Sequence, residues 1–541
     1  MGGGCIRIAS ARGGFVFRRY CLLIGACLGT IAGMQVHVLR SWTVAVVAVL
    51  LSACAQLPTL EGRTVSTAFR DTGNTRLGQS IAPMRREHPG LSGIVSLVDG
   101  HDAFAARAAL ADAAQRSLDI QYYIWHNDLS GALLFDALRR AADRGVRVRL
   151  LLDDNDTAEI EPVLALLDAH PNIEVRLFNP YRHRGLRVLD FLTDFERVNR
   201  RMHNKSFTAD NQVAVIGGRN VGDEYFDAPG DLLYVDLDVL AIGPVVDQVS
   251  SDFDRYWASE SSYPARRVLV EAARAIPPVA HAPQDEALVL AYREAIAQSA
   301  FVRDLQARRL RVNWARVEMV SDDPGKALGR APRSDFLWNR LLEVMPLATR
   351  SFKLVSPYFV PTRSGTVFLT ELAREGIDVS ILTNSLEATD VPAVHAGYAR
   401  WREPLLQAGV HLHELKAGAA PPPLRDRGIG GSSSASLHAK TFVIDRQHVF
   451  VGSLNFDPRS AALNTELGFL IHSPELAAAV DAGIDDRVRS RAYTVQLVDG
   501  QMQWIEQAPG GVTVYTGEPH AGFGRRVGVS VLSLLPIDWL L

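Results

Sequence analysis

Two short stretches of the sequence carry the same reactive side chains at the same spacing. The residues concerned are His203, Lys205 and Asp210 in the first stretch, and His438, Lys440 and Asp445 in the second. The whole chain has only five lysines, so finding two of them inside this pattern is difficult to attribute to chance. The repeated triplet indicates a functional site built twice.

The residues after each histidine alternate as in a half-buried strand, which places His and Lys on one face of the strand. An imidazole can act as a nucleophile or carry a proton near neutral pH. An ammonium group supplies positive charge for an oxyanion such as phosphate. The aspartate at the strand end can orient a neighbour or cap the turn. One copy fits a plain surface strand equally well, but two copies favour phosphate chemistry.

The surroundings of the two triplets also match. A turn of small residues follows each, and Asn220 and Asn455 lie seventeen residues beyond their histidines. Small residues let backbone N–H groups approach an anion, so Asn220, Ser453 and Asn455 are predicted to bind phosphate. Asp236 and Glu466 stand at equivalent positions further on. A carboxylate there can hold an imidazole in one tautomer, so both are predicted to orient the histidines.

Composition limits the function classes. The chain has 541 residues, 47% hydrophobic and 22% charged, which is typical of globular protein with more than one domain. A net charge of −3 gives no sign of the positively charged surface that binding to nucleic acid usually requires, so no nucleic acid partner is expected. The four cysteines all lie within residues 1–54. The folded part therefore has no disulfide, no thiol nucleophile and no Cys-ligated metal. No motif in the sequence suggests another metal or a cofactor, so neither is expected.

The N-terminal region is predicted to be a targeting segment. From Met34 the chain has a short basic region, an apolar run over 42–51, and a stretch ending at Cys54 that resembles a bacterial lipobox. Lipidation of Cys54 would anchor the protein to a membrane of the bacterial cell envelope, facing the periplasm, without spanning it. An uncleaved membrane anchor is the alternative. The start site, Met1 or Met34, stays open, as does the choice between inner and outer membrane.

The order of predicted elements repeats along the chain. A helix over 102–115, a strand over 117–125, a helix over 130–144 and a strand over 146–152 come first. A strand over 351–360 and another over 377–382 follow the same order about 230 to 235 residues later. This internal duplication predicts two α/β sandwich lobes packed as a pseudo-dimer. The two triplets would then form one shared site.

The predicted boundaries follow from this repeat. They are a targeting region over 1–54, a tether over 55–99, a first lobe over 100–260, a connecting helical segment over 261–345, a second lobe over 346–500 and a C-terminal tail over 501–541. The apolar end of the tail fits either a bilayer interface or a closing core segment.

The paired His-x-Lys-x4-Asp motifs, each with its small-residue turn and Asn, resemble the phospholipase D superfamily. Several stretches look most like its bacterial cardiolipin synthase C branch, namely 201–207, 217–220, 236–244 and 253–257. The resemblance covers nearly all of the chain from about residue 100. It implies phospholipase D-type α/β/α sandwich lobes, one active site and no metal.

The resemblance also implies a two-step mechanism. His203 attacks the phosphorus of a phosphatidyl donor to give a phosphohistidine, and His438 protonates the leaving alcohol. His438 then deprotonates an incoming hydroxyl, which displaces the enzyme. Because the motifs are symmetric, the sequence itself does not decide which histidine is the nucleophile.

The acceptor determines the product. Transfer to phosphatidylglycerol, from a second phosphatidylglycerol or from phosphatidylethanolamine, makes cardiolipin. Transfer to water would make the protein a phospholipase D that releases phosphatidic acid, and a phosphodiesterase or nuclease is a third interpretation. A non-catalytic lipid-binding protein predicts decay of one motif, and both are intact. The expected partner is thus a phospholipid membrane, and the oligomeric state stays open.

Overall fold

The computed structural model describes residues 57–228, 233–270, 286–417, 435–508 and 510–533. The chain from Pro58 onward forms one compact unit, and all that follows concerns it. Cys54 and the predicted targeting region lie outside the described residues. Within the described ranges, no helix combines the length and the apolar character needed to cross a bilayer.

The first lobe is built on a mixed sheet. In spatial order its strands are β1 (Ser92–Leu97), β8 (Asp238–Ile242), β6 (Val213–Gly217), β5 (Ser206–Ala209), β2 (Ser117–Tyr122), β3 (Arg147–Asp153), β4 (Ile173–Phe178) and β9 (Ser262–Pro264). Strands β2, β3 and β4 pair in parallel, and the other pairs are antiparallel. Helices α3 (Gly100–Ala113) and α4 (Leu129–Asp143) contribute to the core on one face, and α8 (Pro244–Ala258) packs on the other.

The second lobe repeats this sheet strand for strand. Its order is β10 (Asn313–Ser321), β17 (Leu467–His472), β16 (His448–Gly452), β15 (Lys440–Ile444), β11 (Ser351–Val355), β12 (Asp378–Asn384), β13 (His411–Leu415) and β18 (Ala492–Val498). Two further strands, β19 (Gln501–Ala508) and β20 (Gly511–Tyr515), extend its outer edge. Helix α14 (Thr362–Arg374) covers one face and α18 (Pro474–Arg491) the other.

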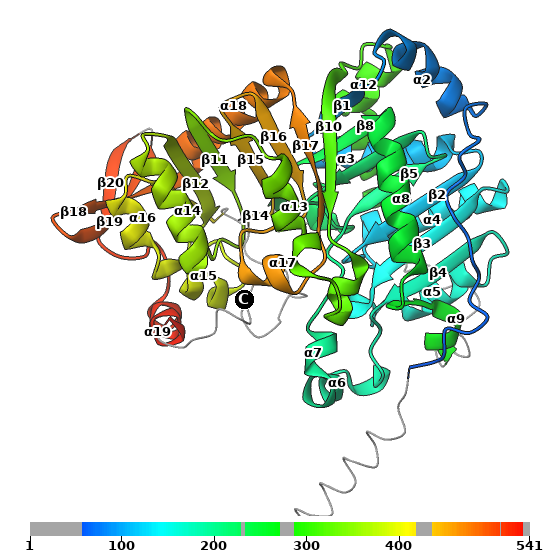
Figure 1. The fold of residues 1–541 in the computed structure, drawn as a ribbon, viewed down its shortest axis with the longest axis horizontal. Coiled ribbons are helices and arrows are strands. Elements are labelled where there is room, and N and C mark those ends of the chain that lie inside the picture. The colour runs from blue at the N-terminus through cyan, green and yellow to red at the C-terminus, as the bar shows by residue number, and fades with distance from the viewer. Residues whose placement is uncertain (1–56, 229–232, 271–285, 418–434, 509, 534–541) are drawn as a thin grey trace, which may run out of the picture. The chain divides into compact units, whose positions relative to one another are not determined.

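Strand pairing joins the lobes. β1 pairs antiparallel with β10, so the described strands of both lobes belong to one 18-stranded sheet (Figure 1). One apolar core contains residues of α8 from the first lobe and of α18 from the second. The two halves of the repeat are therefore packed as one body, as the predicted pseudo-dimer requires.

The predicted fold class is confirmed, and the predicted elements of the repeat have close counterparts in α3, β2, α4, β3, β11 and β12. Glycines end the helices that precede the parallel strands, since Gly145 and Gly376 have φ of 90° and 87°, values that favour glycine. Hydrophobic periodicity and a glycine at a helix end depend only on neighbouring residues, so both can be recognised in the sequence.

The segments outside the two predicted lobes contain more regular structure than the sequence indicates. The tether over 55–99 contains helix α2 (Arg76–Glu87) and strand β1, and the connecting segment over 261–345 contains β10 besides helices. The tail over 501–541 contains β19, β20 and helix α19 (Phe523–Leu532). β1 and β10 are stabilised by pairing with each other and with β8 and β17, partners distant in sequence that local periodicity does not reveal.

Candidate active site

The structure places both triplets where the lobes meet, each just before or at the start of a strand. His203 and Lys205 precede β5, and Lys440 is the first residue of β15. His203 donates its backbone N–H to Thr465 of the other lobe at 2.8 Å, and His438 donates to Val235 at 2.9 Å. The segment leading to each histidine is thus paired with the opposite lobe.

The side-chain hydrogen bonds of the histidines also cross between the lobes. His203 Nδ1 lies 2.8 Å from Glu466 Oε2, and His438 Nδ1 lies 2.6 Å from Asp236 Oδ2. The first lobe therefore supplies the carboxylate for the histidine of the second lobe, and the reverse also holds. In each pair the carboxylate directs Nε2 of the imidazole away from itself.

Each lysine is held beside its own histidine. Lys205 Nζ donates to the carbonyl oxygen of His203 at 2.7 Å, and Lys440 Nζ donates to the carbonyl oxygen of His438. Burial lowers the pKa of Lys440 to about 8 and lowers the pKa of Lys205 well below its usual value. The site therefore holds two poorly solvated lysine amines, and a bound anion would favour their charged forms.

Both imidazoles are held in the neutral form. Burial, together with Lys440, lowers the pKa of His438 to about 3. Burial, Lys205 and Lys440 lower the pKa of His203 as well. A neutral imidazole with Nδ1–H on a carboxylate has an unprotonated Nε2, which is the form required of a nucleophile or general base.

The two orienting carboxyl groups differ in their surroundings. Glu466 accepts hydrogen bonds from Ser453 Oγ at 2.5 Å and Ser460 Oγ at 2.8 Å, and burial raises its pKa to about 7. Burial also acts on Asp236, but His438, Lys440 and Arg219 outweigh it and lower the pKa to about 2. One histidine is therefore paired with a carboxyl group that titrates near neutrality, and the other with a permanent anion.

Tyrosine rings surround the histidines. Tyr123 lies edge-on to His203 with 5.0 Å between ring centroids, and Tyr225 and Tyr234 lie 5.1 and 5.0 Å from His438. Burial, then Asp390, Tyr234 and Tyr123, raise the pKa of Tyr358, so its phenol belongs to the same enclosure. Sequence reasoning missed these residues. The available signal was that Tyr123 and Tyr358 follow the C-terminal ends of β2 and β11, where such folds place ligand groups.

The aspartates of the triplets lie at the opposite ends of their strands from the histidines. Asp210 accepts backbone N–H groups of residues 115, 116 and 117 at 2.7 to 3.2 Å. Asp445 accepts the equivalent groups of residues 349, 350 and 351 at 2.7 to 3.2 Å. Both have positive φ, 52° and 55°, at the turn that follows the strand. This geometry supports the turn-capping role and gives no contact with the imidazoles that would make them catalytic.

The predicted phosphate ligands are partly engaged with protein groups. Asn220 Nδ2 donates to the hydroxyl of Tyr225 at 3.0 Å, and its Oδ1 accepts from the backbone of Ile124 at 3.3 Å. The Ser453 hydroxyl donates to Glu466. Asn455 Oδ1 is buried with no hydrogen-bond partner among the described residues. Their role toward phosphate stays a prediction.

A cluster of His126, Asp128 and Glu224 has donor atoms close enough together for a metal. His126 contacts Asp156 through Nε2 at 3.0 Å and Glu224 through Nδ1 at 3.1 Å. Burial lowers its pKa, but these hydrogen bonds prevail and raise it to about 11. In this structure His126 forms an ion-pair network with Asp128, Asp156 and Glu224.

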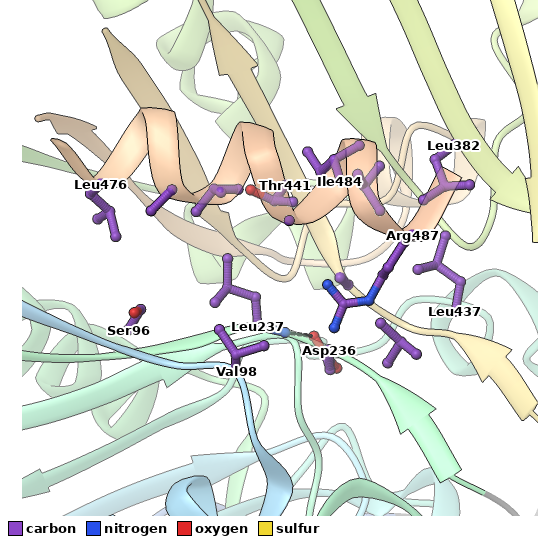
Figure 2. A pocket seen from close by; sticks show the side chains of 16 residues that line it. Ser96, Val98, Asp236, Leu237, Leu382, Leu437, Thr441, Leu476, Ile484 and Arg487 are labelled. Atoms are coloured by element: carbon purple, nitrogen blue, oxygen red, sulfur yellow. Dashed lines mark hydrogen bonds between the residues drawn. The ribbon is translucent and has the colours of Figure 1, made fainter. Parts of the chain in front are cut away.

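A mostly apolar cavity of about 130 Å³ lies between α18 and the segment around Asp236 and Leu237 (Figure 2). Leu437, Ala439 and Thr441 line it, whereas the alternate residues His438 and Lys440 do not. The alternation expected from the sequence therefore holds around this motif: reactive side chains on one face, packing side chains on the other.

The chain matches the family model described as "Cardiolipin synthase, PLD-like domain" twice, over residues 108–257 and 341–487. The protein belongs to this family of phospholipase D-like proteins, and each matched segment corresponds to one lobe. The predicted superfamily is therefore confirmed.

Individual proteins are similar along most of the chain. Cardiolipin synthase C of Escherichia coli is 47% identical over 471 residues, 86% of this chain and 100% of the relative. An uncharacterized protein of Helicobacter pylori is 34% identical over 436 residues, 79% of this chain and 85% of the relative. A crystal structure of phosphatidylserine synthase from Haemophilus influenzae aligns with a TM-score of 0.49 at 14% identity, covering 76% of this chain and 91% of that one. The predicted resemblance to cardiolipin synthase C is confirmed.

The position of the aspartates leads to a test of their role. Asp210→Ala leaves three backbone N–H groups without an acceptor, so we expect it to lower the free energy of unfolding by about 3 kcal/mol. Asp445→Ala should lower it less, since this carboxylate is only partly buried. Thermal unfolding measures the stability, and turnover per folded molecule should stay within about threefold of the parent.

The matched control for both variants is Asp486→Ala, because Asp486 is an exposed aspartate of α18 and its loss should have little effect. A loss of turnover in Asp210→Ala or Asp445→Ala as large as that of a histidine variant, with stability unchanged, would show that the aspartates act in catalysis.

Proposed function

We propose that the protein is a phosphatidyltransferase that makes cardiolipin from phosphatidylglycerol and a second phospholipid, phosphatidylglycerol or phosphatidylethanolamine. The observation that carries the proposal is the 47% identity to cardiolipin synthase C over that relative's full length. The crossed histidine–carboxylate pairs support it, because they bring two neutral imidazoles together with the buried amines of Lys205 and Lys440 in one site.

In the first step, Nε2 of His203 attacks the phosphorus of the donor lipid. The bond from phosphorus to the headgroup oxygen breaks, and the headgroup leaves as an alcohol with a proton from His438. The product is a phosphatidyl group bound to His203 Nε2. The pairing of Nδ1 with Glu466 supports this assignment, since it leaves Nε2 free to attack.

In the second step, His438 takes the proton from a hydroxyl of phosphatidylglycerol, and the oxygen displaces His203 from phosphorus. Lys205 and Lys440 stabilise the charge on the non-bridging oxygens in both steps. The side-chain amides of Asn220 and Asn455 supply further donors, whereas the Ser453 hydroxyl already donates to Glu466. Asp236 and Glu466 keep the two imidazoles in the productive tautomer.

The membrane location is a separate proposal. We propose that Cys54 is lipidated and anchors the protein in the bacterial cell envelope, facing the periplasm. The support is the lipobox-like stretch alone, because residues 1–56 lie outside the described part of the chain. The protein should incorporate a labelled fatty acid in cells and Cys54→Ala should not, and equal labelling of both would contradict lipidation of Cys54.

A product assay tests the reaction. Purified protein in vesicles of phosphatidylglycerol and phosphatidylethanolamine should form cardiolipin, measured by mass spectrometry. His203→Ala and His438→Ala should each lower the rate by at least about 10³-fold, because both steps need both imidazoles. His472→Ala, in β17 and outside the two motifs, is the matched control and should keep its activity.

Several outcomes would contradict the proposal. Phosphatidic acid without cardiolipin would make the protein a hydrolase, and no lipid product would favour the nuclease or the non-catalytic interpretation. With donor lipid labelled in its phosphate, a covalent protein adduct that persists in His203→Ala would move the nucleophile to His438.

The pH dependence should reflect the unequal carboxyl groups. Glu466 has a pKa raised to about 7, so below that pH it is neutral and accepts the Nδ1–H of His203 more weakly. We therefore expect kcat/KM to fall as pH drops below about 7. It should fall again above about pH 8, where Lys440 loses its proton. Initial rates between pH 5 and 9 check this.

Two variants identify the group responsible for the acid limb. Glu466→Gln should be slower and should lack the change near pH 7, whereas Asp236→Asn should be slower but keep it, because the pKa of Asp236 is about 2. An acid limb that survives in Glu466→Gln would assign it to another group.

A further inference from the structure

Large apolar side chains are exposed on a helical projection of the first lobe. The projection consists of residues 184–198, with helices α6 (Val188–Thr193) and α7 (Phe195–Val198), and we call it the apolar hairpin. Its exposed residues are Leu186 at 54%, Val188 at 55%, Phe191 at 39%, Leu192 at 78% and Phe195 at 37%. Single exposed apolar residues are ordinary, but five within ten residues form a patch that normally meets a partner.

The apolar hairpin leads directly into the catalytic motif. Helix α7 ends at Val198, five residues before His203. Asn199, between them, accepts hydrogen bonds from the Arg459 guanidinium of the second lobe at 2.8 Å, once through its side chain and once through its carbonyl. Tyr181, just before the hairpin, contacts Asn155, which in turn donates to the hydroxyl of Tyr123. The hairpin is thus fixed to the rim of the active site.

A second exposed apolar surface comes from the other lobe. Helix α19 exposes Phe523 at 83%, Val527 at 45% and Val531 at 56%, a stripe with helical spacing. Val529, on the other face of the helix, is buried in a small core with Leu386 and Ala396. In the described part of the apolar tail, one face of α19 therefore closes a core, as one of the two predictions for the tail had it. The other face is exposed, which leaves the second prediction, a bilayer interface, open.

Helix α19 is also tied to the active-site rim. Arg525 donates to the carbonyl of Thr389, and the neighbouring Asp390 accepts from the hydroxyl of Tyr358 at 2.6 Å. Tyr358 belongs to the tyrosine enclosure of the histidines. Figure 1 shows α6, α7 and α19 at the same, lower edge of the folded unit.

The two surfaces differ in how their arginines are paired. Residues 182–200 include five arginines against three acidic residues, but all five are ion-paired, and Arg184 and Arg187 pair with Asp154 and Glu161 outside that range. Helix α19 has two arginines and no acidic residue. Exposed apolar side chains beside these arginines are the features of a segment that lies in the interfacial region of an anionic bilayer, and the proposed phospholipid substrate favours a bilayer over a protein partner or a second copy.

We propose that the apolar hairpin and α19 insert into the surface of a bilayer containing anionic phospholipid, one from each lobe, and hold the active-site mouth against it. The proposal rests on the proposed function, since it concerns how a phospholipid reaches His203. The lipid phosphate can then enter the site while the acyl chains stay in the bilayer.

The first experiment compares two substrates with the full-length protein. Leu192→Asp and Phe523→Asp should each lower turnover of phosphatidylglycerol in vesicles by roughly tenfold, because an inserted carboxylate opposes docking. Turnover of short-chain phosphatidylglycerol below its micellar concentration should not change. Leu347→Asp is the matched control, 87% exposed and in neither segment, and should behave as the parent.

The outcomes separate the two proposals. Equal losses on both substrates, or no loss on vesicles, would overturn bilayer docking. A parent protein that forms no product from either substrate would overturn the proposed function instead.

The second experiment does not depend on catalysis. All four cysteines lie within residues 1–54, so replacing them by serine leaves the rest of the chain free of thiols. A polarity-sensitive fluorophore is then attached through Leu192→Cys, Phe523→Cys or, as the control, Leu347→Cys. Vesicles of phosphatidylglycerol should shift the emission of the first two to shorter wavelength and leave the third unchanged.

Two results would contradict docking in this assay. One is that adding vesicles changes the emission of the fluorophore at none of the three positions. The other is a shift that appears without lipid as protein concentration rises, which would assign these surfaces to contacts between copies of the chain.

Discussion

The site depends on two hydrogen bonds that cross between the lobes. His203 is oriented by Glu466 and His438 by Asp236, and each pair joins residues more than 200 positions apart. A lobe by itself would have a histidine without its carboxylate and a carboxylate without its histidine. Both hydrogen bonds are shorter than 3 Å, so the relative position of the lobes must be fixed to a fraction of an ångström.

The pairing of β1 with β10 fixes the position of one lobe relative to the other. Shorter strand pairings next to the histidines hold the two lobes together at the site itself. Strands β7 (Leu233–Val235) and β14 (Ala435–Leu437) pair in parallel directly before Asp236 and His438. Met202 and Thr465 form the equivalent bridge directly before His203 and Glu466. The backbone thus aligns each histidine with its carboxylate before the side chains meet.

The two lobes and most residues of the candidate site can be predicted from the sequence, because the duplication shows each motif and each strand–helix pattern twice. The triplets, Asp236 and Glu466 are visible as matched spacings, and a strand–helix order that occurs twice is stronger evidence than either copy alone. The sequence does not show that the carboxylates are exchanged, since spacing gives positions along the chain and not which lobe they face. It also does not show that Asp210 and Asp445 lie away from the imidazoles, because a repeated spacing does not distinguish a residue that holds the turn from one that reacts.

Symmetry of the backbone does not make the two half-sites alike. Where the first lobe has Gly218, the second has Ser453, and a Cβ at Gly218 would lie 2.2 Å from Asp236 Oδ1. The shorter Asp236 therefore approaches the backbone, while Glu466 is held by serine hydroxyls. Their pKa values of about 2 and about 7 differ because His438, Lys440 and Arg219 outweigh burial at Asp236, whereas burial prevails at Glu466 although Lys205 and the serine hydroxyls lower its pKa. Carboxyl groups whose environments separate their pKa values allow two identical imidazoles to take different roles.

The charge of the site bears on how one imidazole, His438, can be an acid in the first proposed step and a base in the second. Burial and the two ammonium groups keep His438 neutral, so it has no proton at Nε2 to give to a leaving group. In the proposed mechanism, a phosphodiester bound between Lys205 and Lys440 would bring one negative charge there. That charge would offset the repulsion that lowers the pKa of His438 and would favour the protonated forms of both lysines. The substrate itself would then make the acid form of His438 more accessible.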